Sequence, residues 1–234
     1  MCNALDMVGK ICYKIVGGIM ENNNKDILQC FEDIQSFSNQ LSIKSYVWGG
    51  YVQDIIEGKI LREHGDIDVF IENMDMNIDE LIEKFNNAKY KCSYLNDIQM
   101  LNLVKNEVKA TINPIRFIDK TAIWKHIGEQ GFISFPKDWL DKEYRNFYNL
   151  SILTAGIEFE YCIRKIIRYM NPNWTGNIRD KDIIANAYYE KKLLDKNISP
   201  KELLGKIWGY SPFWLKDGYN GYEPPVLVIG REYK

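Results

Sequence analysis

Two aspartates separated by a single residue, Asp66 and Asp68, are the side chains of this sequence best suited to chemistry. Successive side chains of a β-strand point to opposite faces, so both carboxylates would share one face while Ile67 and Val69 point into the core. Magnesium prefers oxygen ligands and commonly binds one or two carboxylates together with substrate phosphates. The pair predicts a magnesium site, and the competing interpretation is a solvated strand edge.

A pair of glycines lies upstream of the aspartates. Gly49 and Gly50 follow a predicted strand at 44–48 and precede a predicted helix at 51–57. Glycine permits positive φ and the close approach of a phosphate, and a helix start offers unpaired N–H groups. We therefore expect this bend to bind phosphate. A second pair at 17–18 has no acidic pair behind it and is interpreted as a turn.

The order of strand, diglycine, short helix and Asp-Ile-Asp resembles the nucleotidyltransferase superfamily. The segment REHGDIDVF at 62–70 is similar to small bacterial lincosamide and aminoglycoside nucleotidyltransferases. The resemblance is clear over 44–71 and weaker to about residue 190. It implies transfer of a nucleoside monophosphate from an NTP, with ATP expected, to a small-molecule hydroxyl, and it suggests an antibiotic as that acceptor. Asp66 and Asp68 would be the catalytic magnesium ligands, and Gly49 and Gly50 would bind the phosphates.

The sequence departs from this family at a third carboxylate, which relatives carry on a later strand. The segment VKATINPIRF at 108–117 places Thr111 at that position, with Asn113 two residues on. Neither side chain is a general base, so Glu107 or Asp119 would have to replace the carboxylate. Alternatively, the chain binds a nucleotide without efficient transfer, as a sensor or a toxin–antitoxin component.

A second, weaker likeness lies at 179–182 (RDKD), which resembles the start of a late helix in relatives. It implies that Arg179 and Lys181 contact the triphosphate, whereas the competing interpretation is a solvated helix start. Lys165 is an alternative cation. The acidic residue that relatives carry later in the helix is replaced by Ala185. The i, i+4 spacing on the preceding helix predicts a surface ion-pair ladder, formed by Glu160, Arg164 and Arg168.

Composition favours a small acceptor. The 234 residues are 46% hydrophobic, and the formal net charge of −2 with a pI near 5.8 argues against a main role in binding duplex nucleic acid. A tRNA or protein acceptor stays open. No apolar stretch predicts a membrane span or signal peptide, so we expect a cytoplasmic protein. The cysteines lack metal or redox spacing and are expected to be reduced, at positions 2, 12, 30, 92 and 162.

Charge patterning adds two expectations around the aspartates. Between Glu63 and Glu83 the chain has eight acidic residues and no lysine or arginine. This segment could attract magnesium and a cationic acceptor such as an aminoglycoside, or it could be the polar face of a helix. His64 is interpreted as a partly exposed loop residue, with steadying of the metal loop as the alternative.

The pattern of elements predicts an α+β fold with a mixed sheet flanked by helices. We expect a nucleotidyltransferase-like core at 22–150 and a mainly helical region at 151–234 that ends in an aromatic-rich cap. Hydrophobic periodicity predicts further helices at 25–41, 78–85, 157–170, 180–194 and 200–208. Alternation and turn signals predict further strands at 90–95, 98–105 and 108–118.

Overall fold

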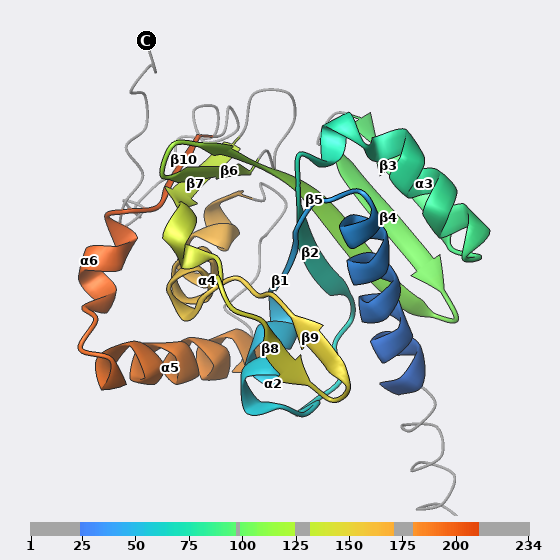
Figure 1. Cartoon of the computed structure of the whole chain (residues 1–234). Helices are drawn as coiled ribbons and strands as arrows, with labels where there is room; N and C mark the ends of the chain where they lie inside the picture. Colours follow the sequence, from blue (N-terminus) through green and yellow to red (C-terminus); the bar gives the residue numbers. More distant parts are fainter. Residues whose placement is uncertain (1–23, 97–98, 125–131, 171–179, 211–234) are drawn as a thin grey trace, which may run out of the picture.

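The computed structural model describes residues 24–96, 99–124, 132–170 and 180–210, and of these it describes the backbone alone at 166–170, 180–182 and 208–210. Within these residues the chain forms an eight-stranded mixed sheet flanked by helices (Figure 1). The expected α+β class is therefore confirmed. The aromatic cap from residue 211 onward and Gly17–Gly18 lie outside the described residues.

The sheet has the strand order β1-β2-β5-β6-β7-β10, with β4 also paired to β5 and β3 paired to β4. Its strands are β1 (Ser45–Trp48), β2 (Ile67–Glu72), β3 (Lys91–Leu95), β4 (Met100–Lys105), β5 (Val108–Ile118), β6 (Thr121–Trp124), β7 (Phe132–Pro136) and β10 (Trp208–Tyr210). The pair β2/β5 is parallel and the other pairs described in this sheet are antiparallel. A separate hairpin is formed by β8 (Arg145–Phe147) and β9 (Leu150–Ile152).

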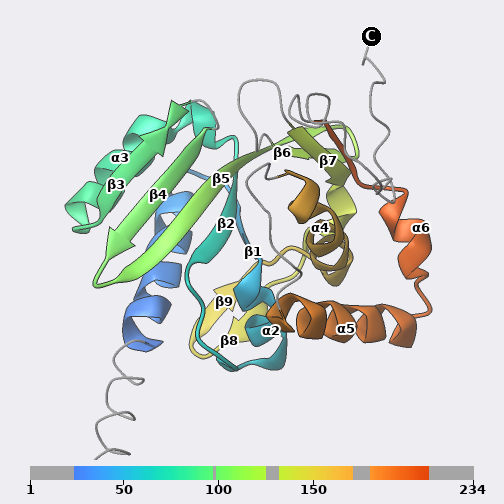
Figure 2. The ribbon, with the colours of Figure 1, turned by 180° about the vertical axis from the view of Figure 1, so that it is seen from behind.

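Helices cover both faces of the sheet, as Figures 1 and 2 show from opposite sides. A helix at 24–40 and α3 (Ile78–Asn87) share one core cluster with Ile67, Val69 and Ile71 of β2. The opposite cluster contains Phe70 of β2 and residues of α4 (Ile157–Met170), α5 (Asp180–Asp195) and α6 (Pro200–Leu204). α2 (Gly50–Glu57) contributes to both clusters. The side chains of β2 thus alternate between two buried layers.

The expected helices and strands are present with small shifts at their ends, with one exception. The helix predicted at 200–208 ends at Leu204, and Trp208 begins β10 instead. β10 pairs with β7, a partner distant in sequence, so local periodicity could not reveal it. Strands β6 to β9, which are three to five residues long, were likewise not predicted.

The structure bears on two expectations drawn from composition, namely the state of the cysteines and the presence of membrane-spanning helices. Cys30, Cys92 and Cys162 are free thiols, while Cys2 and Cys12 lie outside the described residues. Among the residues described, no helix combines the length and the apolar character that crossing a membrane requires.

Aromatic side chains fill the layer beneath the candidate active site. The ring of Phe70 stacks on Trp48, with centroids 5.1 Å apart and planes 10° apart, and meets Trp124 edge-on at 5.1 Å. Phe159 of α4 contacts both Phe70, at 5.5 Å, and Trp48, at 6.1 Å. Trp48 is the residue directly before Gly49, and Phe70 lies two residues after Asp68. This cluster therefore holds the two strands that carry the motifs.

We expect Phe70→Ala to lower the free energy of unfolding by about 3–5 kcal/mol, because the side chain is fully buried and its loss leaves a cavity. Urea denaturation followed by circular dichroism measures the change. Ile118→Ala, at a side chain that is 61% exposed, is the control and should change stability by less than about 0.5 kcal/mol. Equal effects of the two substitutions would contradict the role of the cluster.

Candidate active site

The two aspartates lie at the start of β2. Asp66 is the residue immediately before the strand and is exposed, whereas Asp68 is half-buried within it. Ile67 and Val69 belong to the core cluster on the opposite face, as the alternation predicts. β1 pairs with β2 so that Trp48 is the partner of Asp68. The residue that follows Trp48 is Gly49, so the pairing brings the diglycine bend beside Asp68.

The diglycine bend has the conformation that its sequence indicates. Gly49 has φ 80° and ψ −137°, which is a region suited to glycine, and Gly50 begins α2. A Cβ at Gly49 would lie only 2.6 Å from Oδ2 of Asp68, so this carboxylate packs directly against the glycine backbone. A Cβ at Gly50 would clash with Nδ1 of His64. Both positions therefore have room for glycine alone.

Glu160 and Arg164 of α4 also contact this bend, which sequence reasoning missed. The Gly49 N–H donates to Oε1 of Glu160 at 2.7 Å, and Arg164 donates to the Gly49 carbonyl at 2.8 Å. Arg164 also pairs with Oε2 of Glu160 at 3.0 Å. Glu160 is fully buried. The predicted surface ladder is therefore wrong for this pair, because the spacing alone could not show which way the helix face points.

Negative charge is crowded around Asp68. Burial raises the pKa of Asp68 well above its usual value, and the nearby carboxylates of Asp66 and Glu160 raise it further, while Arg164 lowers it. Burial also raises the pKa of Glu160 to about 7, against the lowering effects of Arg164 and the Gly49 N–H. A cation near Asp66 and Asp68 would relieve this repulsion.

The donor set fits magnesium with a nucleotide. Among the residues that the structure describes, no three histidine, cysteine, aspartate or glutamate side chains form a complete metal site. Two adjacent carboxylates beside a backbone bend match the way magnesium is held by one or two carboxylates together with substrate phosphates. Asp66 and Asp68 can therefore supply the protein ligands, and phosphates would have to supply others.

The strand beside the aspartates has a hydroxyl at the position where the resemblance implies a third carboxylate. In the parallel β2/β5 pair, Thr111 is the Cα partner of Asp68, so the two residues are neighbours on one face. The Thr111 hydroxyl donates to Oδ1 of Asn102 on β4 at 3.4 Å. Glu107 and Asp119 lie just beyond opposite ends of β5, each with positive φ. Neither lies beside Asp68, so neither replaces the carboxylate.

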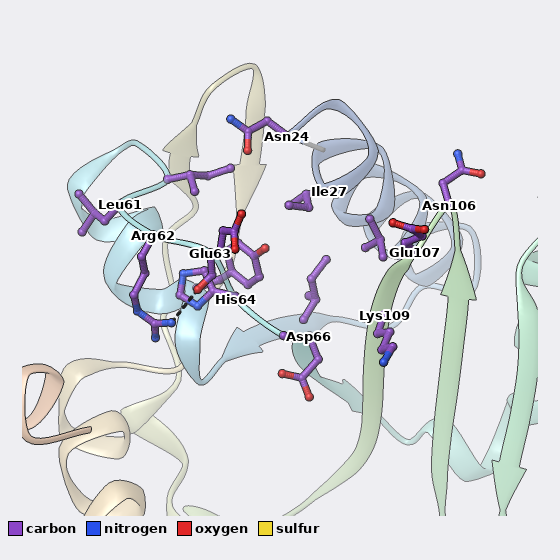
Figure 3. Close-up of a pocket in the computed structure, with 15 residues that line it drawn as sticks. Asn24, Ile27, Leu61, Arg62, Glu63, His64, Asp66, Asn106, Glu107 and Lys109 are labelled. Atoms are coloured by element: carbon purple, nitrogen blue, oxygen red, sulfur yellow. Dashed lines mark hydrogen bonds between the residues drawn. The ribbon is translucent and has the colours of Figure 1, made fainter. Parts of the chain in front are cut away.

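β5 also brings a lysine to the site. Lys109 precedes Thr111 by two residues and shares its face, and it borders the same cavity as Asp66. In Figure 3 the side chains of Lys109 and Asp66 point in the same direction, away from the helix at 24–40. This lysine is not among the predicted site residues, because only the β2/β5 register places it near Asp66.

A buried pair fastens the loop before Asp66 to α2. Nε2 of His64 lies 2.8 Å from Oδ2 of Asp54, and the two side chains are 3% and 1% exposed. The same Asp54 oxygen accepts a hydrogen bond from the Leu61 N–H at 3.2 Å. The His64 ring lies against Tyr51, with centroids 4.1 Å apart. His64 is therefore a loop residue of intermediate exposure, as the first interpretation expects, but its side chain is buried, which agrees with a role in steadying the loop.

A cavity of about 300 Å³ opens beside Asp66 (Figure 3). It is bounded by the start of the helix at 24–40, the loop at 60–67 and the turn between β4 and β5. Ile27 and Ile67 contribute apolar surface, and charged side chains border it, namely Arg62, Glu63, Asp66, Glu107 and Lys109. The cavity is large enough for a small polar molecule.

The acidic segment is partly neutralised within the protein. Arg116 pairs with Asp75, and Lys84 lies 3.4 Å from Glu80 on α3. These carboxylates are therefore engaged away from Asp68, as the interpretation of a polar helix face expects.

The structure describes the other positively charged residues that were predicted to contact the triphosphate only in part. Arg179 lies outside the described residues, and the structure describes the backbone of Lys181 in α5 without its side chain. Their contact with a triphosphate stays a prediction. The Lys165 ammonium lies 5.4 Å from the centroid of Tyr161, and Ala185 is buried in the core.

Comparison with known proteins supports the fold. No family model and no curated protein matches the sequence. The solution structure of the antibiotic-resistance factor ANT(2'')-Ia matches with a TM-score of 0.59 at 12% identity, over 77% of this chain and 90% of that chain. A crystal structure of ANT(2'')-Ia with adenylyl-2''-tobramycin also gives 0.59 at 12% identity, over 76% and 95%.

A third solved structure, the lincomycin-bound lincosamide antibiotic adenylyltransferase LnuA, matches with a TM-score of 0.50 at 18% identity, over 67% of this chain and 92% of that chain. At these identities the likeness establishes the fold. The resemblance predicted from the diglycine and Asp-Ile-Asp motifs is thus confirmed, and the chain has the fold of the antibiotic nucleotidyltransferases.

Proposed function

We propose that this protein is a magnesium-dependent nucleotidyltransferase that moves a nucleoside monophosphate from an NTP, ATP above the others, to a hydroxyl of a small molecule. The observation that carries the proposal is the packing of the Asp68 carboxylate against Gly49, with Asp66 close enough to raise its pKa. A metal-binding pair and a phosphate-binding bend thus lie at one place. That juxtaposition suits a triphosphate held between backbone donors and a cation.

The residues at this place take distinct roles. Asp66 and Asp68 hold magnesium, which when bound supplies positive charge to the phosphate oxygens. Gly49 provides the bend but donates its own N–H to Glu160, and the Val52 N–H donates to the Gly49 carbonyl, so the proposed phosphate donors are the N–H groups of Gly50 and Tyr51 at the start of α2. Lys109 adds a cation beside Asp66, and Arg179 and Lys181 are proposed to add others.

The reaction depends mainly on positioning. In-line attack by a hydroxyl on the α-phosphate releases pyrophosphate, and the protein holds both partners in place. We propose an antibiotic as the acceptor class because the similar structures include a complex with adenylyl-2''-tobramycin and one with lincomycin. The proposed location is the cytoplasm, where ATP is available.

A second candidate function follows from Thr111. Because a hydroxyl lies beside Asp68 where a carboxylate would take the attacking proton, the protein could bind magnesium and a nucleotide without turnover. A screen for pyrophosphate release with all four NTPs and a panel of aminoglycosides, lincosamides, tRNA and protein acceptors separates the two functions. Tight nucleotide binding without pyrophosphate release from any acceptor would favour the binding protein.

Asp66→Asn and Asp68→Asn should each lower the transfer of labelled AMP at least about 100-fold, because an amide oxygen is a weaker magnesium ligand and lacks the charge. The rate with the best acceptor from the screen is the measurement. Asp79→Asn, at an exposed position in the same acidic segment, is the matched control and should keep the wild-type rate. An undiminished rate in Asp68→Asn would remove that residue from the mechanism.

Thr111→Asp should raise the transfer rate by about tenfold or more if a missing general base limits turnover, since such a base commonly contributes 10²-fold or more. Without magnesium the added charge beside Asp68 should lower the urea midpoint, and magnesium should restore it. Thr111→Asn, which adds similar bulk without charge, should show neither effect. If magnesium restores the midpoint but the rate stays flat, the absent carboxylate is not what limits transfer.

A further inference from the structure

Glu160 and Arg164 hold both polar groups of Gly49. Glu160 accepts the Gly49 N–H at 2.7 Å, and Arg164 donates to the Gly49 carbonyl at 2.8 Å while pairing with Glu160 at 3.0 Å. The three residues form a closed set of hydrogen bonds, although Gly49 lies 111 positions before Glu160 and 115 positions before Arg164 in the sequence. We call this arrangement the α4 clamp.

The clamp is costly for the folded protein. Glu160 is fully buried and the Arg164 side chain is 12% exposed. Burying an ion pair costs desolvation free energy, and well-packed apolar side chains of similar volume are often as stabilising or more so. The buried ion pair is therefore explained more directly by the way it holds Gly49 than by a contribution to the stability of the fold.

Glu160 cannot itself react with a substrate in this arrangement. Its side chain has no exposed surface, and each carboxylate oxygen already accepts a hydrogen bond, one from Gly49 and one from Arg164. Although it is a third carboxylate near Asp68, it does not replace the one missing at Thr111. It can act on the site only through Gly49.

Gly49 is the point where such an effect would matter. Its backbone has φ 80° and ψ −137°, its Cα side faces the Asp68 carboxylate, and the residue after it begins α2. A rotation of the Gly49 peptide would move both the first N–H groups of α2 and the surface on which Asp68 rests. The clamp opposes that rotation by holding the N–H and the carbonyl together.

The C-terminal helices support the clamp and the far end of α2. The Arg164 guanidinium lies 5.4 Å from the ring centroid of Tyr189 on α5. Glu57, the last residue of α2, accepts a hydrogen bond from the Tyr188 hydroxyl at 2.7 Å and lies 3.3 Å from the Lys192 ammonium. α2 is thus held from both ends by α4 and α5.

We propose that Glu160 and Arg164 are positioning residues that fix the Gly49 peptide so that α2 and Asp68 are pre-set for magnesium and the triphosphate, an inference that rests on the proposed function. Loss of the clamp leaves the metal ligands in the chain but lets their support move. The defect should therefore be mainly in nucleotide affinity and KM, with a smaller change in kcat.

The test compares Glu160→Ala, Glu160→Gln and Arg164→Met by calorimetry with magnesium and the α,β-methylene analogue of ATP. Glu160→Ala and Arg164→Met should weaken binding about 10- to 100-fold, as losses of supporting contacts around metal sites do. Glu160→Gln keeps an acceptor for the Gly49 N–H and should lose less than Glu160→Ala. Asp141→Asn removes the negative charge from another i, i+4 carboxylate–arginine pair, with Arg145, and should bind as the wild type does.

Hydrogen exchange at the Gly49 amide, followed by NMR, reads the clamp without any nucleotide. The amide should be protected in the wild type and in Asp141→Asn and should exchange at least tenfold faster in Glu160→Ala. Urea midpoints identify variants that fail to fold. If Glu160→Ala does not fold, Glu160→Gln and Arg164→Met decide the question by the same two measurements.

The outcomes separate the clamp from the proposed function. If the wild type binds none of the four magnesium nucleotides, the proposed function fails, whatever the exchange shows. If the wild type binds but Gly49 exchange is the same in all variants, the clamp does not exist in solution. Faster exchange with unchanged affinity and KM would show that the clamp is structural only, which overturns the positioning role.

Discussion

The contact between the Asp68 carboxylate and the backbone of Gly49 is the constraint on which the candidate site depends. It requires a residue without a Cβ, a strand pairing that places Trp48 opposite Asp68, and a chain that turns at once into α2. The stacked rings of Trp48 and Phe70, one residue before the bend and two after the aspartate, hold that pairing in place. Packing beneath the sheet and chemistry at its edge are therefore fixed by the same few residues.

The contact also brings carboxylates close together in a buried place, where their negative charge is unfavourable. Asp68 has Asp66 on its own chain segment and Glu160 across the bend, and burial adds to the effect of both. Arg164, which lowers its pKa, is shared with Glu160 and the Gly49 carbonyl. A divalent cation would be stabilised by this field, because it offsets the repulsion that folding creates.

Local sequence was enough to predict the two motifs and to predict which side chains of β2 lie on which face of the sheet. The alternation of Ile67, Asp68 and Val69 gave the correct burial, and the diglycine gave the positive φ. The likeness to the nucleotidyltransferases added the position of Thr111, which the structure places beside Asp68. These inferences succeed because each depends on neighbours in sequence or on a motif whose order is preserved.

The residues that were missed depend on contacts between distant segments. Lys109 lies near Asp66 only through the parallel register of β2 and β5, and Glu160 meets Gly49 only once α4 packs across the bend. The i, i+4 spacing of Glu160 and Arg164 is the same on a buried helix face as on an exposed one, so the pattern could not distinguish a clamp from a surface ion pair. Strand β10 was missed for the same reason, because its pairing with the distant strand β7 cannot be inferred from its own three residues.

The absence of a carboxylate at Thr111 and the presence of one at Glu160 do not compensate each other. A general base must reach the proton of the attacking hydroxyl, and Glu160 is buried with both oxygens engaged. What Glu160 can do is hold the bend, so the site would have strong support for binding and weak support for proton removal. In the proposed transfer reaction, such a balance would suit an acceptor whose hydroxyl loses its proton easily or to water, and it would make affinity for the nucleotide the property most sensitive to change in this region.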